Sequence, residues 1–511
     1  MTSPLTRERQ VFRLGPVPKE SFFFGLNIVA SVYLLACIGI AVFAFARLPL
    51  TSALLMAAVM VFFGAPLVAR FQRKTLYQWM SLLIRWSLLI SRGENVYLSG
   101  RFSRVPGGTN KLPGVLYESV LHEGWVQHRA RQKFGVIQMP KTNQFTVVIE
   151  CYPQGNEAID QDSVDLSVFN WGSAVNFISM GGDVDGVTVI IENGIETGNR
   201  LRREVRALAH RDPTGRFGGD GLYGGELPAR MMLESAEYLA DGSPRLWARV
   251  AITYRATTNS RRNDPGEQIK EMARRLGGVL TVLNEAQLNP RLLAPEEIVT
   301  LTKRAYTPAA VNDLELAEMT DEGHGLTWDD AGPMAQKAKM STLYHDGCYS
   351  TTWEMAERPK SAFVETVLRP LLDPNPDLMR KRVAICYRPH APVESARIIE
   401  RDLKHAKSGM NRFRKAGPSF EAQERLDDVE EQRDDQGRGH GLTMVGLMVT
   451  VTVPEDADVP KADAVTKDLG VRSRLRLQRM WFSQDTAFAA TLGVGVLMPS
   501  HAAKVSSKLG A

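Results

Sequence analysis

Two long apolar runs at the start of the chain most constrain what it can fold into. They cover Phe22–Ala46 and Leu48–Ala69, contain no charged side chain and are separated by Arg47 alone. As helices that rise about 1.5 Å per residue, each is long enough to cross a hydrocarbon core of about 30 Å. The runs therefore predict a transmembrane helical hairpin whose outer turn is Arg47–Thr51.

The charges that flank the two runs predict the orientation of this hairpin. Four Lys or Arg residues precede the first run and four follow the second, whereas the turn carries only Arg47. Because cytoplasmic flanks are rich in Lys and Arg, we expect a multi-pass protein of the inner cell membrane with both termini in the cytoplasm. Thr75–Ile90, with Trp79 and Trp86, is expected to lie at the inner interface or to continue the second span. A cleaved signal peptide and a buried helical hairpin remain the alternatives.

Net charge separates the first 92 residues from the rest. These residues hold ten Lys and Arg against Glu8 and Glu20, a net charge of +8, and the whole chain carries +5, so the remainder carries −3. The basic part would face anionic membrane lipids. The nearly neutral remainder makes nucleic acid an unlikely partner, because binding to phosphates requires clustered positive charge. The four cysteines are sparse and unpatterned, as in a reducing compartment without disulfides.

The remaining chain alternates between strand and helix patterns. It predicts an α+β fold in which the transmembrane hairpin precedes a large cytosolic region of two repeated strand and helix halves. The domains are expected at 1–92, 93–310 and 311–511, either from an old duplication or from chance similarity of the two halves. Predicted strands cover 135–139, 144–151, 187–192, 246–255, 348–355, 382–388, 442–453 and 471–477. Predicted helices cover 162–180, 227–239, 265–283, 295–305, 362–372, 393–415, 461–469 and 483–489.

The catalytic motifs discussed below are absent from this chain or incomplete in it. The dipeptide Gly-Lys is absent, which excludes a Walker-type P-loop. Gly219, Gly221 and Gly224 match a dinucleotide fingerprint, but the strand that must precede such a loop is missing. His210-Arg211-Asp212 mimics a kinase catalytic loop without its companion motifs. We therefore expect no catalytic residue and no cofactor, and the chain is not expected to be an enzyme.

Four residues form a weak candidate metal site. His345 and Cys348 have His-x-x-Cys spacing, and Cys386 and His390 have Cys-x-x-x-His spacing, on neighbouring predicted strands. Four nitrogen and sulfur ligands would satisfy zinc, although buried free cysteines explain the same pattern. Asp183 and Asp185 suit a divalent cation less well than they suit a turn.

The charge run at 421–435 is acidic and follows a basic stretch at 397–415. Such a pattern is typical of a solvated helix pair or a hairpin. A docking arm for a partner is the alternative interpretation.

Five C-terminal segments stand out for their order and spacing, namely Trp328-Asp-Asp-Ala-Gly-Pro333, Tyr344-His-Asp-Gly347, Arg382-Val-Ala-Ile-Cys-Tyr-Arg-Pro389, Leu475-Arg-Leu-Gln-Arg-Met-Trp481 and Ser483-Gln-Asp-Thr-Ala-Phe-Ala-Ala-Thr-Leu492. Together these segments resemble an actinobacterial family of integral membrane proteins of conjugation-like, type IV secretion loci. The hairpin looks like a PrgI-type subunit, and the rest looks like the amino-terminal domain of the conjugation ATPase without its motor. The resemblance carries over no catalytic residue.

This resemblance implies a non-enzymatic inner-membrane scaffold of a type IV secretion machine. Its expected partners are a separate secretion ATPase, other channel subunits and further copies of itself, since such machines are symmetric oligomers. A type VII secretion component of the EccE sort and a membrane-associated enzyme of unknown type remain the alternatives. The sequence does not identify the cargo.

Overall fold

The structure is a computed structural model of the 511-residue chain. It describes residues 35–40, 43, 49, 51–52, 56, 70–71, 74–100, 103, 110–127, 130–153, 159–209, 226–239, 244–318, 320, 323–357, 359, 363–390, 392–412, 420–437 and 441–498. The chain divides into two compact units. The first unit includes Val96–Ser395 and Arg438–Val496, and the second includes Gly15–Asn95 and Ala396–Gly437.

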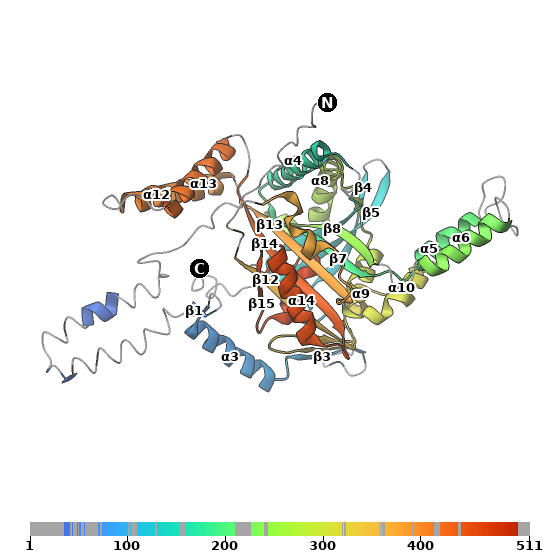
Figure 1. Ribbon diagram of the computed structural model, residues 1–511, viewed down its shortest axis with the longest axis horizontal. Coiled ribbons are helices and arrows are strands. Elements are labelled where there is room, and N and C mark those ends of the chain that lie inside the picture. The colour runs from blue at the N-terminus through green and yellow to red at the C-terminus, as the bar shows by residue number, and fades with distance from the viewer. Residues whose placement is uncertain are drawn as a thin grey trace, which may run out of the picture. The chain divides into compact units, whose positions relative to one another are not determined.

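The first unit is built on one sheet of 13 strands, in which every pairing is antiparallel (Figure 1). The strands follow the order β3-β10-β11-β12-β14-β13-β7-β8-β6-β5-β4, with β15 beside β12 and β9 beside β6. Their bounds are β3 (Val96–Leu98), β4 (Val120–Gln127), β5 (Arg131–Met139), β6 (Gln144–Cys151), β7 (Val184–Ile195), β8 (Pro244–Arg255), β9 (Arg291–Leu292), β10 (Ala335–Ala338), β11 (Leu343–His345), β12 (Cys348–Glu357), β13 (Arg380–Pro389), β14 (Thr443–Pro454) and β15 (Arg476–Arg479).

Helices cover both faces of this sheet. The first unit contains α4 (Gln161–Ser179), α5 (Asn199–Ala209), α6 (Glu226–Leu239), α7 (Asn259–Asn263), α8 (Pro265–Glu285), α9 (Pro295–Tyr306), α10 (Val311–Glu318), α11 (Arg369–Leu372), α14 (Val459–Arg472) and α15 (Gln484–Thr491). The longest of them, α8, begins at Pro265, and the side chain of Asp264 accepts a hydrogen bond from Gly266 N. Both features are typical of a helix N-terminus, as the sequence predicts.

One face of the sheet is apolar. Alternate residues of β6 and β8, such as Val147, Ile149 and Ile252, pack against α4 and α8 in one core cluster. Farther along the same face, Val383 and Val449 belong to a second cluster with residues of α11 and α14. Successive side chains of a strand point to opposite faces of a sheet. The residues between these apolar positions therefore point to the other face.

The opposite face is partly polar. The Thr146 and Thr253 hydroxyls lie 3.0 Å apart across β6 and β8, and Thr450 Oγ1 lies 2.8 Å from both Thr352 Oγ1 and Thr491 Oγ1. Thr491 belongs to α15, which packs on β12, β13 and β14. The polar face is therefore buried under a helix, and its hydroxyl groups satisfy one another.

The segment that follows α15 lies against this polar face. Gly493 has a φ of +77°, and a Cβ there would collide with the side chain of Ile190 on β7. Gly495 has a φ of +91°, and a Cβ there would collide with Thr146 on β6. Glycine is required at both positions by the close approach to the sheet as well as by the backbone conformation.

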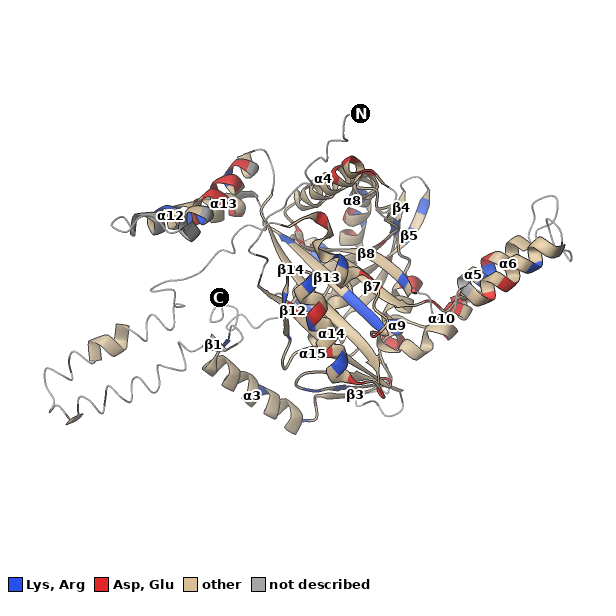
Figure 2. Ribbon diagram, in the orientation of Figure 1, with Lys and Arg blue, Asp and Glu red and all other residues tan. Residues whose placement is uncertain are grey.

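The second unit contains three longer helices, α3 (Leu76–Ser91), α12 (Pro392–Arg412), which starts at its boundary with the first unit, and α13 (Phe420–Gly437). Arg70–Phe71 and Lys74–Thr75 form the short strands β1 and β2 that precede α3. Lys407 Nζ of α12 lies 3.7 Å from Glu430 Oε1 of α13. Figure 2 shows acidic residues spaced along α13, so the run at 421–435 forms a charged helix beside the more basic α12.

The prediction of a transmembrane hairpin is corrected by the structure. Among the described residues, no helix combines the length and the apolar composition that crossing a membrane requires. α3 would extend over only about 24 Å and contains Arg85. The predicted spans Phe22–Ala46 and Leu48–Ala69 lie largely outside the described residues. The same finding corrects the prediction of a multi-pass protein of the inner membrane with both termini in the cytoplasm.

The expectation of two repeated halves is also corrected. Strand β7 of the predicted first half pairs with β13 of the second, with Ile191 opposite Val383. Both predicted regions, 93–310 and 311–511, therefore contribute strands to one α+β sheet. Alternation of strand and helix along the chain indicated many of the elements but missed β4, and the strand predicted at 471–477 overlaps the end of α14 and only the first two residues of β15. The alternation carries no information on which strands pair.

Candidate functional site

The structure does not bring the four candidate zinc ligands together. His345 lies opposite Cys348 in the β11–β12 pair, and Cys348 lies opposite Pro454 of β14. Cys386 lies opposite Gly446, eight residues away along the same β14 strand, which is a separation of about 26 Å. Within the described part of the chain, no three His, Cys, Asp or Glu residues form a group that could hold a metal ion.

His345 instead has a structural role on the buried polar face. Its Nδ1 lies 2.5 Å from the Tyr306 carbonyl oxygen, and its Nε2 lies 2.7 Å from Ser350 Oγ. A carbonyl only accepts, so Nδ1 carries the proton and Nε2 accepts from the serine hydroxyl. Burial lowers the pKa of His345 to about 4, so that the ring is neutral near pH 7.

The other polar motifs also have partners or lie outside the described residues. Both carboxylate oxygens of Asp183 accept hydrogen bonds from Arg275 Nη1, at 2.8 and 2.9 Å. Asp185 accepts a hydrogen bond from Gln144 Nε2 at 2.7 Å, so the two aspartates have separate partners. The glycine motif at 219–224 and the motif at 210–212 lie outside the described residues.

The strongest concentration of buried charge surrounds Glu192 of β7. Arg249 Nη2 of β8 lies 2.5 Å from Glu192 Oε2, and Arg304 Nη2 of α9 lies 3.6 Å from the same oxygen. The Nε atoms of Arg380 and Arg382 on β13 lie 3.5 and 3.8 Å from Glu192 Oε1. We call these five residues the arginine cluster. It joins three adjacent strands to a helix.

Four positive charges and one negative charge give the arginine cluster a net charge of +3. Burial raises the pKa of Glu192, but the arginines outweigh burial and hold that pKa well below its usual value. Burial lowers the pKa of Arg304 and of Arg382 to about 10, with Glu192 acting in the opposite direction. Glu192, Arg304 and Arg382 are therefore charged near pH 7.

Several nitrogen atoms of the arginine cluster have no acceptor. Among the described residues, none accepts a hydrogen bond from Nε, Nη1 or Nη2 of Arg382, or from Nε of Arg249 and of Arg304. Arg382 is 1% exposed, and its guanidinium lies 5.0 Å from the centre of the Phe488 ring. Buried donors normally have partners, and so this region has unused capacity to bind an acceptor.

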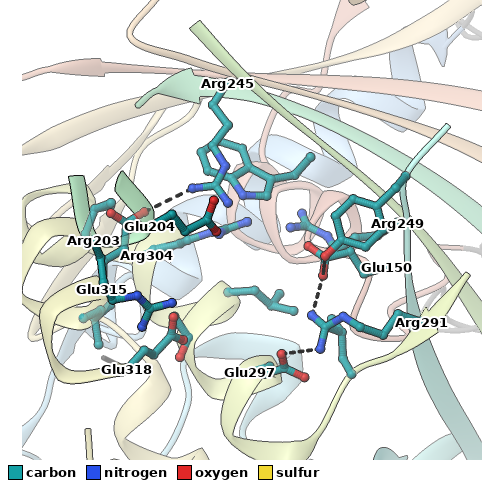
Figure 3. A pocket seen from close by; sticks show the side chains of 17 residues that line it. Glu150, Arg203, Glu204, Arg245, Arg249, Arg291, Glu297, Arg304, Glu315 and Glu318 are labelled. Carbon is teal, nitrogen blue, oxygen red and sulfur yellow. Dashed lines mark hydrogen bonds and ion pairs between the residues drawn. The ribbon is translucent and has the colours of Figure 1, made fainter. Parts of the chain in front are cut away.

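A pocket of about 390 Å³ borders the arginine cluster (Figure 3). Trp247 lines it, with the guanidinium groups of Arg304 and Arg245 at 4.3 and 4.8 Å from its ring centre. Its charged lining consists of five arginines and five glutamates, namely Arg203, Arg245, Arg249, Arg291, Arg304, Glu150, Glu204, Glu297, Glu315 and Glu318.

Several of the outer charges of this pocket pair with one another. Arg291 donates hydrogen bonds to Glu150 and Glu297 at 2.5 and 2.6 Å. Arg245 lies 3.5 Å from Glu315. These glutamates are engaged by other arginines, so Glu192 remains the carboxylate shared by the four guanidinium groups of the arginine cluster. The arrangement is suited to holding an anion, because guanidinium groups bind oxyanions and stay protonated near neutral pH.

The arginine cluster was not predicted from the sequence, although the sequence contains a signal for it. Glu192 ends the apolar run VTVIIE, Arg249 interrupts LWARVAI, and Arg382 begins RVAICYR. A charged residue within an apolar strand is rarely buried without a partner. The sequence therefore indicates which strands contain a buried charged residue. Which charged residues contact one another depends on how the strands pair.

A comparison with protein families matches the start of the chain. A family model described as "Domain of unknown function (DUF8461)" matches residues 19–78. No curated protein matches the chain. The matched region precedes the large sheet and does not include the pocket or the arginine cluster.

Proposed function

We propose that this protein is a non-enzymatic scaffold of a conjugation-like, type IV secretion machine, and that it docks a separate P-loop ATPase. The observation that carries this proposal is an exposed apolar stripe on α6. Leu227, Met231 and Tyr238 are 71%, 61% and 86% exposed. Their spacing of four and then seven residues places them on one side of the helix.

The opposite side of α6 contains small buried residues. Ala229 and Ala236 are 2% and 4% exposed, and α6 packs against α5 (Figure 1). We call this helix pair the α5–α6 arm. Since α5 already covers the alanine side, the apolar stripe is free to meet another protein. Contiguous exposed apolar side chains commonly mark interaction sites.

The basic residues of α5 indicate the charge that a partner would present. Arg203 and Arg206 are exposed on this helix, and Arg206 Nη2 lies 3.7 Å from Glu237 Oε1 of α6. A partner with an apolar patch beside acidic residues would be complementary to the α5–α6 arm. The ATPase is chosen as the partner because the chain resembles the amino-terminal domain of a conjugation ATPase and contains no Gly-Lys dipeptide.

Affinity purification from the native cell at native expression levels tests this proposal. The full chain carries a tag, and the proteins that co-purify are identified by mass spectrometry. Recovery of a P-loop ATPase with other secretion subunits would support the scaffold role. Purification without an ATPase, or nucleotide turnover by the isolated chain that one substitution abolishes, would contradict it.

A further inference from the structure

We propose that the pocket beside the arginine cluster binds a phosphate-type oxyanion, which Arg249 and Arg304 contact. This inference does not depend on the proposed docking of an ATPase. It rests on the placement of the two arginines, because both line the pocket and both belong to the arginine cluster. They therefore connect a cavity that a ligand can enter to a buried excess of positive charge.

The net charge of the arginine cluster favours the binding of an anion. The arginine cluster holds a net charge of +3 beside Glu192, which is fully buried. An uncompensated charge is costly in the protein interior, where little water is present to screen it. An anion in the adjoining pocket would offset this charge. Three of the five glutamates that line the pocket, Glu150, Glu297 and Glu315, are already paired with Arg291 or Arg245.

Hydrogen-bond donors of the two arginines also favour the binding of an oxyanion. Arg249 is 2% exposed, and its Nε finds no acceptor among the described residues. Nε of Arg304 also lacks one in this part of the structure, and the ion pair of Arg304 with Glu192, at 3.6 Å, is longer than a hydrogen bond. A tetrahedral oxyanion offers several acceptor oxygens, and guanidinium groups recognise phosphate through paired N–H donors.

The size of the pocket suits a phosphate-type ligand. A volume of about 390 Å³ accommodates inorganic phosphate, pyrophosphate or the phosphate end of a nucleotide. Arg203 of α5 also lines the pocket (Figure 3). Its side chain is exposed. It can therefore reach the outer side of an anion that the two inner arginines hold.

Calorimetric titration of the full chain with phosphate, pyrophosphate and ATP, each at matched ionic strength, tests the assignment. We expect saturable binding, with an affinity at least about tenfold weaker in Arg304→Gln. Arg203→Glu serves as the second variant, because an exposed substitution should leave folding intact and still weaken binding. Arg274→Gln, on the exposed surface of α8, is the matched control and should bind as the wild type does.

The ligands distinguish the two sources of the oxyanion. Equal affinity for pyrophosphate and ATP would assign the site to the phosphate group alone, whereas much tighter ATP binding would assign it to a nucleotide. Both results support the proposal. The absence of saturable binding of any of the three ligands would overturn it, as would binding that both Arg304→Gln and Arg203→Glu leave unchanged.

Discussion

Arg382 on β13 lies directly opposite Glu192 on β7, yet its Nε is 3.8 Å from Glu192 Oε1 and forms no hydrogen bond with it. The shorter contact of Glu192 is with Arg249, at 2.5 Å. Among the described residues, Glu192 Oε1 accepts no hydrogen bond although two guanidinium groups lie within 4 Å of it, so the carboxylate attracts Arg380 and Arg382 through charge rather than through hydrogen bonds. Glu192 and its arginines therefore affect both the stability of the sheet and the charge beside the adjoining pocket.

Replacing Glu192 with Gln should destabilise the fold strongly. The substitution leaves four buried arginines without a counter-charge, and breaking a buried ion pair from one side costs about 3–5 kcal/mol. Denaturant unfolding of the full chain measures this change. Glu267→Gln is the matched control, because Glu267 bonds Lys270 at the surface of α8, and its loss should cost less than about 0.5 kcal/mol. A Glu192→Gln variant as stable as the control would contradict the description of the arginine cluster.

His345 should make the protein sensitive to mild acid. In the folded protein its pKa is about 4, whereas the unfolded value is about 6.5. As the pH falls from 6.5 to 4, the unfolded chain takes up a proton that the folded chain does not. The free energy of unfolding should therefore drop by about 3 kcal/mol from this residue alone.

A His345→Asn variant separates this effect from packing. Its stability near neutral pH should fall, because the bond to Ser350 is lost, but its further loss towards pH 4 should be smaller than in the wild type. Unfolding curves at several pH values give both quantities. Equal acid sensitivity of the variant and the wild type would show that His345 does not control it.

Gly495→Ala should be more damaging than an ordinary glycine substitution at positive φ. The new Cβ would collide with Thr146 in addition to straining the backbone. We expect a loss of more than about 2 kcal/mol in the free energy of unfolding. Gly347 has a φ of +76° but open space around its Cβ position, so Gly347→Ala isolates the backbone strain, about 1 kcal/mol. Equal losses in the two variants would mean that the segment after α15 does not pack against β6.

Local signals allowed many elements to be predicted from the sequence. Strand 144–151 matches β6 (Gln144–Cys151), because its apolar run follows a turn that ends at Asn143 in a left-handed conformation. Helix 265–283 agrees with α8 because Asp264 and Pro265 mark its start. β4 was not predicted, since His122, Glu123 and Gly124 interrupt its pattern, and Gly124 is explained only by the close approach of Phe134 and Ile269.

The pairing of the strands and the residues that form the site could not be predicted from the sequence. The pairing of β7 with β13 joins residues almost 200 positions apart, and neither strand contains a signal for the other. The same pairing creates the arginine cluster, so the site could not be assembled without it. The zinc hypothesis failed to account for strand direction, which places Cys348 and Cys386 at different ends of β14.

The most direct test of the scaffold proposal measures the affinity of the co-purifying ATPase for the full chain and for variants of the α6 stripe. We expect the combined substitutions Leu227→Asp, Met231→Asp and Tyr238→Asp to weaken binding by at least about 100-fold, because central apolar contacts dominate interfaces. Val471→Asp, at another exposed apolar position, should bind as the wild type does. Equal affinity of the triple variant and the wild type would contradict the α5–α6 arm as the docking surface.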